Sequence, residues 1–164
     1  MFAYDPSEWS DLFVATAGAS AALAGLVFVA VSINIKRILE FPGLPERALE
    51  TILLLMVVLL VSIVGLVPGQ SNVALGVELL VVGLAIGGTI FRLPTVRSDV
   101  EDEPRIWLWS RWGVRLTAVV PLMVAGASLL GESGGGLYWL AAGIAFAVAG
   151  AIANAWVLLV EILR

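Results

Sequence analysis

Glu78 is the residue with the clearest chemical potential, because this ionisable side chain lies about two turns inside an apolar segment. An ionisable group in a membrane span is costly and needs a partner, a water path or a shallow position. Two interpretations stay open. Glu78 is either a structural group, hydrogen-bonded to a neighbouring helix or extended towards the membrane surface, or a carboxylate that binds a cation or a proton. Copies that met at Glu78 would form a carboxylate ring, as in cation-selective pores.

The other polar residues of the apolar segments are expected to be structural. Glu50 follows Arg47 by three residues near the start of a helix, so we expect it to cap that helix and to pair with Arg47. Glu161 lies within a turn of the end of the last apolar segment and is expected to reach water. Hydrogen bonds between helices are predicted for three further residues: Ser32, Asn34 and Asn154.

The composition argues against several classes of activity. The chain has no Cys and no His, which removes thiol nucleophiles, zinc-thiolate sites and the commonest general base. It shows no nucleotide-binding loop and no paired-carboxylate motif. We therefore expect no enzyme, no cofactor and no metal site. The formal net charge of −4 also makes nucleic acid an unexpected partner.

The elements that must position these residues are membrane helices. The 164-residue chain is 60% hydrophobic and 13% charged, whereas a soluble domain is about half apolar and a quarter charged. Much of its surface must therefore face a lipid bilayer. A spanning helix needs about 20 mostly apolar residues. Five such segments predict one all-α transmembrane bundle over residues 1–164, with spans at about 12–35, 48–67, 73–91, 108–130 and 137–162.

The basic residues predict how the chain is threaded. All nine Lys and Arg lie beside the first connection, in or beside the third, or at the last residue. The positive-inside rule then places the N-terminus outside and the C-terminus in the cytoplasm. The N-terminal segment has three acidic and no basic residues, so the first helix is expected to be retained rather than cleaved as a signal peptide.

Small residues form stripes on three of the five predicted helices. Such stripes let helix backbones approach closely in lipid. They comprise Ala15, Gly18, Ala22 and Gly25 in the first helix, Gly76, Gly83 and Gly87 in the third, and Gly143, Ala147 and Gly150 in the fifth. Glu78 lies on the opposite side of its helix from that stripe. The stripes are predicted to pack helices within one chain, between copies in a homo-oligomer, or both.

Three segments within about the first 75 residues, GASAALAGLVFVAVSIN, LPERALE and LVPGQS, suggest a family. They resemble small, uncharacterised bacterial multi-pass membrane proteins, some of which are labelled as modulators of a membrane-bound ATP-dependent protease. The resemblance implies the bacterial inner membrane as the location, and it adds another membrane protein to the candidate partners beside a second copy of the chain. It brings no catalytic motif and no site residue.

Two functional hypotheses follow, with a transporter ranked third after them. The first is a non-enzymatic accessory, regulatory or structural membrane protein that acts through helix packing with itself or with a membrane partner. The second is a homo-oligomeric cation channel with Glu78 in its path, and an outer surface bearing Asp5, Glu8, Asp11 and Glu132 would gather cations for it.

Overall fold

The computed structural model describes the backbone of residues 2–93 and 105–163, and the side chains of residues 2–93 and 112–160. Two short 3-10 turns, Phe2–Tyr4 and Pro6–Trp9, precede the helices. The helices are α1 (Ser10–Ile33), α2 (Ile35–Glu40), α3 (Leu44–Gly65), α4 (Asn72–Arg92), α5 (Arg105–Gly131) and α6 (Leu137–Leu163). The predicted all-α architecture is confirmed for these residues.

Five of these helices are long and apolar enough to cross a membrane: α1, α3, α4, α5 and α6. Their bounds differ from the predicted spans by a few residues at most. The second predicted span begins earlier than expected, at Leu44, because Pro45 occupies the first turn of α3 and Gly43 supplies a left-handed N-cap with φ of 86°. The short helix α2 was not predicted, and its Ile38 is buried with Leu44, Ala48 and Leu158 at the end of the bundle where α3 begins.

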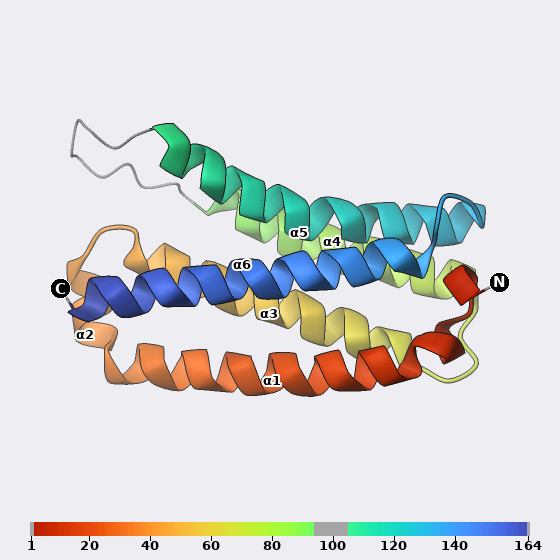
Figure 1. Ribbon diagram of the computed structural model, residues 1–164, viewed down its shortest axis with the longest axis horizontal. Coiled ribbons are helices and arrows are strands. Elements are labelled where there is room, and N and C mark those ends of the chain that lie inside the picture. The colour runs from red at the N-terminus through yellow and green to blue at the C-terminus, as the bar shows by residue number, and fades with distance from the viewer. Residues whose placement is uncertain (1, 94–104, 164) are drawn as a thin grey trace.

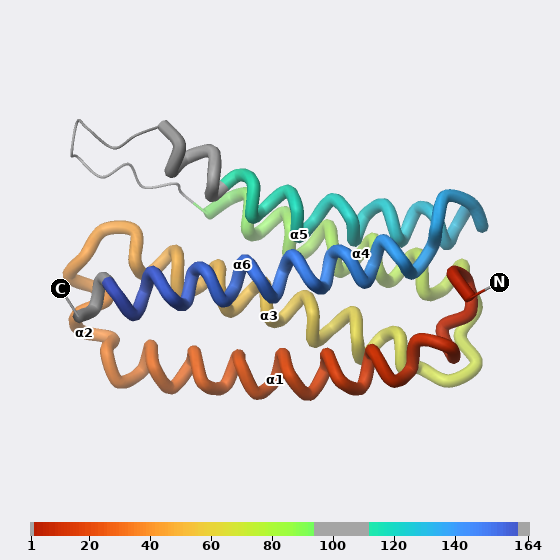
Figure 2. Tube along the Cα trace, viewed as in Figure 1, coloured from red at the N-terminus to blue at the C-terminus, as the bar shows by residue number. Residues whose placement is uncertain are grey.

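Four helices close on one another, and the fifth is peripheral. α3 packs against α4, α4 against α5, α5 against α6, and α6 back against α3, whereas α1 packs mainly along α3 (Figure 1). Figure 2 shows α1 as a separate rod along one edge of this bundle. Only 11% of the α1 span is buried inside the chain, against 61% of the α3 span. The two chain ends lie at opposite ends of the bundle, as an odd number of long helices requires (Figure 1).

One face of α1 attaches it to α3. The Phe13 ring is fully buried, and it lies so close to Gly65 that an added Cβ there would be 2.6 Å from a ring carbon. Nearby, the hydroxyls of Thr16 and Ser62 share a hydrogen bond of 2.7 Å. This bond between two helices was not predicted from the sequence, where both residues stand in long apolar runs.

The small-residue stripe of α4 packs against α5 within the chain. A Cβ added at Gly76 would lie 2.9 Å from the carbonyl oxygen of Gly126, and one added at Gly83 would lie 2.8 Å from the sulfur of Met123. Gly87 approaches Val119 in the same way, at 2.9 Å. The absence of side chains at these glycines therefore sets how closely the two helices approach.

The stripe of α6 is also used within the chain. A Cβ at Gly143 would stand 3.4 Å from the backbone nitrogen of Leu122 in α5. Ala147 is 1% exposed, and a Cβ at Gly150 would lie 2.5 Å from a methyl group of Val114. Two of the three predicted stripes thus form contacts of the four-helix bundle.

Candidate functional site

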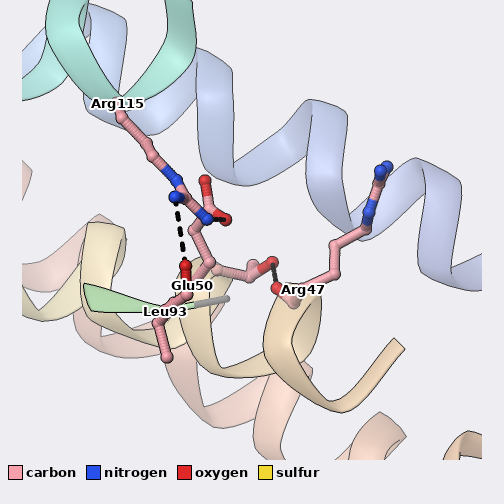
Figure 3. A network of polar contacts seen from close by, with 5 residues as sticks. Arg47, Glu50, Leu93 and Arg115 are labelled. Carbon is pink, nitrogen blue, oxygen red and sulfur yellow. Dashed lines mark hydrogen bonds and ion pairs between the residues drawn. The ribbon is translucent and has the colours of Figure 1, made fainter. Parts of the chain in front are cut away.

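A buried ion pair joins two helices at the end of the bundle where α3 begins. The Arg115 Nη2 of α5 donates a hydrogen bond of 2.9 Å to Glu50 Oε2 of α3, as Figure 3 shows. The two side chains are 1% and 2% exposed. Charges removed from water in this way are stable only with close pairing and further hydrogen bonds.

The helical repeat explains why these two charges point inward. Glu50 precedes Leu54 by four residues and Val58 by eight, and all three are buried on the face of α3 that packs into the bundle. Arg115 likewise lies on the buried face of α5, because it precedes the buried residues Ala118 and Leu122 by three and seven residues. Each charge therefore lies on the apolar face of its own helix.

Arg115 also contacts the end of a third helix. Its Nη1 donates to the carbonyl oxygen of Leu93 at 3.4 Å, and Leu93 is the C-cap residue of α4. A cation is favourable there, because unpaired carbonyl groups give a helix C-terminus a partial negative charge. The guanidinium further lies 5.9 Å from the ring centroid of Trp112. One side chain on α5 thus holds α3 and the end of α4.

The sequence-based interpretation of Glu50 was wrong in its partner. We expected capping and pairing with Arg47, but α3 begins at Leu44, which places Glu50 in its second turn, and the carboxylate bonds to Arg115. The Arg47 side chain is directed away from Glu50 in Figure 3, while its carbonyl oxygen accepts from the Thr51 hydroxyl at 2.8 Å. The available signal was the charge on the apolar face of each helix.

Glu78 lies at the opposite end of the bundle and has a partner in its own chain. Gln70, in the connection before α4, donates from Nε2 to Glu78 Oε2. Gln70 also lines an open pocket of about 600 Å³, together with Asp5 and Glu132. Glu78 is partly buried, and Thr89 on the same face of α4 is exposed. Glu78 therefore lies on the lateral surface of the bundle, on the side of α4 that no described helix covers fully, and not in the bundle core.

The stripe of α1 faces away from the chain. Ala15, Gly18, Ala22 and Gly25 are all exposed. A Cβ built at Gly18 or Gly25 would meet no described atom within 4 Å. At about 100° per residue, this stripe lies on the opposite side of α1 from Phe13 and Thr16, which face α3. Packing of this stripe within the described chain is therefore not observed.

None of the three polar residues predicted to form hydrogen bonds between helices has such a bond among the described residues. Ser32 Oγ donates to the carbonyl of Phe28 at 2.8 Å, and Asn34 Nδ2 donates to the carbonyl of Ala30 at 2.9 Å, so both bonds lie within one segment of chain. Asn154 Nδ2 is buried and has no hydrogen-bond partner among the described residues. Glu161 lies outside the described side chains.

Taken together, fold and site define a class: a helical, apolar protein whose described residues form five membrane-length helices, with α1 at the periphery of a four-helix bundle that contains a buried ion pair. Comparison with family models, curated proteins and solved structures found no match to this chain. The resemblance to small bacterial multi-pass proteins therefore stays a prediction.

Proposed function

We propose that this chain is a non-enzymatic, multi-pass protein of the bacterial inner membrane that acts through lateral contact of α1 with a helix of another chain. The other chain is a second copy or a different membrane protein. In this proposal the N-terminus is outside and the C-terminus is cytoplasmic. The role is accessory, regulatory or structural, because the protein positions or stabilises a partner in the bilayer.

The observation that supports this proposal is that two of the three small-residue stripes are covered by helices of the same chain, whereas the third is not. Those of α4 and α6 are occupied by neighbouring helices, and their glycines allow approaches of 2.5–3.4 Å to a built Cβ. The stripe of α1 also consists of small residues at helical spacing, but it faces outward. In lipid, small residues favour helix association because they allow close backbone contact, whereas bulky apolar residues gain little over lipid contact.

A cross-linking experiment tests the partner of α1. The chain lacks Cys, so a single Ala22→Cys variant in native membranes reports contact at the stripe alone. A disulfide-linked dimer would identify a second copy, and a photo-reactive group at the same position would capture a different membrane protein. Absence of both products would refute lateral contact through α1.

A matched pair of substitutions tests whether the small size of the stripe matters. Gly18→Leu should abolish the cross-link, because a bulky side chain prevents close backbone approach. Ala30→Leu is the control, since Ala30 is also exposed but lies about 100° around the helix from the stripe. Equal loss in both variants would contradict the assignment of the stripe as the contact.

The proposed threading has its own test. Ser133 and Glu40 are exposed at opposite ends of the bundle. In spheroplasts, Ser133→Cys should react with an impermeant thiol reagent added outside, and Glu40→Cys should react only after the membrane is opened. The reverse pattern would invert the threading.

The cation-channel hypothesis remains as a second candidate, and the link from Glu78 through Gln70 to the acidic outer pocket favours it. It requires several copies to meet at Glu78. Purified protein in liposomes should then conduct monovalent cations, and Glu78→Gln should lower that flux while Glu40→Gln, at an exposed position at the other end of the bundle, leaves it unchanged. A monomer by native mass spectrometry, or flux unaffected by Glu78→Gln, would refute this candidate.

A further inference from the structure

Three polar atoms near the buried ion pair have no hydrogen-bond partner among the described residues. They are Arg115 Nε on α5, Asn154 Nδ2 on α6 and Glu46 Oε2 on α3, and each is shielded from the surface. A buried polar atom without a partner destabilises the fold, so native proteins satisfy such atoms with protein groups, water or ions. Three such atoms on three neighbouring helices call for a common explanation.

The helix register brings Asn154 to the level of the ion pair. Gly150, one turn before Asn154, lies between α5 and α3, because a built Cβ would be 2.5 Å from Val114 and in van der Waals contact with Leu54 at 3.5 Å. Leu158, one turn after Asn154, packs in a buried cluster with Ala48. Asn154 therefore faces the part of α3 between these two contacts, which is where α3 contributes its half of the ion pair.

The other two atoms come from the same region. Arg115 is 1% exposed and extends from α5 to Glu50, so its Nε lies inside the bundle beside that contact. Glu46 precedes Glu50 by one turn and therefore shares its face of α3. Figure 3 shows the ion pair between α3 and α5, with α6 passing behind.

The hydrogen-bonding types of these atoms identify the occupant. Arg115 Nε and Asn154 Nδ2 are donors, whereas Glu46 Oε2 is an acceptor, so the occupant must both accept and donate. Water does both. A small anion would satisfy the two donors but would lie close to the carboxylates of Glu46 and Glu50. We propose that water fills a polar chamber at this end of the bundle and links α3, α5 and α6 through Glu46, Arg115 and Asn154.

Towards the middle of the bundle, the chamber is closed by an apolar layer. The narrow space between α3, α5 and α6 beyond the ion pair is lined only by apolar residues, among them Val57, Val61, Leu122, Leu140 and Ile144. Small apolar cavities stay dry. Water therefore reaches Glu50 and Arg115 from the α3 start of the bundle and not through its middle. Polar groups at membrane depth are tolerated where they line such a cavity.

Water-edited solid-state NMR on the full chain in bilayers tests this inference. Magnetisation starting on water should reach Arg115 Nε–H and the Asn154 side-chain amide as early as it reaches the exposed Arg92. The backbone amide of Val58, in the buried core, should lag behind. The Arg115 signal is assigned by its disappearance in Arg115→Gln.

A variant pair and an ion exchange decide the outcome. Asn154→Leu removes one of the side chains that hydrogen-bond to the proposed water, so the early transfer of magnetisation to Arg115 Nε–H should be lost. Ile152→Leu, at an exposed position of the same helix, should leave that transfer unchanged. Transfer to Arg115 as slow as to Val58 overturns the proposal. An Arg115 resonance that shifts when chloride is replaced by bromide, or when anionic lipid is omitted, assigns the place to an anion and also overturns it.

Discussion

Breaking the Glu50–Arg115 pair from one side should destabilise the bundle strongly. At an effective dielectric of about 20, two unit charges at the observed 2.9 Å attract by about 6 kcal/mol. Desolvation opposes most of this gain, so the pair adds little net stability, but loss of one partner leaves a buried charge uncompensated and costs about 3–5 kcal/mol. We therefore expect Glu50→Gln and Arg115→Gln each to fall in this range.

Arg115→Gln should be the worse of the two variants. It leaves the carboxylate of Glu50 unpaired and also removes the donor to the Leu93 carbonyl at the end of α4. After Glu50→Gln, by contrast, Arg115 keeps Leu93 and can still donate to the new amide oxygen. The double variant removes both charges, so its cost should be well below the sum of the singles, with about 2–3 kcal/mol of coupling.

The assay is reversible unfolding in mixed micelles, with the free energy of unfolding measured for the wild type, both single variants and the double variant. Glu40→Gln and Arg92→Gln are the controls, since both residues are exposed and should change the free energy by no more than about 0.5 kcal/mol. Single variants as mild as these controls, or costs that simply add in the double variant, would refute the argument from burial.

Three further expectations follow from local geometry. Gly76→Ala should destabilise the fold by about 1–3 kcal/mol because its Cβ would collide with a backbone carbonyl, whereas Gly18→Ala, with open space around it, should be neutral or stabilising by up to about 1 kcal/mol; thermal unfolding measures both. Thr16→Val removes a hydrogen bond between two helices and should cost about 0.6 kcal/mol in the same measurement, and no loss at all would contradict that bond. Hydrogen bonds from the side chain and backbone of Ser7 lower the pKa of Asp5, so Ser7→Ala should raise that pKa towards its ordinary range, which ¹³C NMR of the carboxyl group follows. The N-terminal turn keeps this stabilisation above the ordinary pKa range and loses it as the pH falls through the lowered pKa of Asp5.

The helices themselves could be predicted closely, and their partners only in part. The α4 stripe was predicted as a contact surface, and its Gly76 indeed meets a helix backbone. The α1 stripe looks the same in sequence, yet Gly18 faces outward. Spacing on one helix shows which residues share a face but does not show which face another helix covers. The same limit applies to Glu50, whose partner Arg115 is 65 residues away.

Hydropathy, helix length and the distribution of charge are local properties, so the sequence by itself determined five membrane-length helices, their order and the residues that share each face. Tertiary structure decided the rest. It closed four helices around the Glu50–Arg115 pair, left α1 at the edge, and gave Glu78 a partner from its own loop. The physical reason is that pairing of buried charges and close packing of small residues depend on contacts between distant segments, whose geometry exists only once the helices have assembled.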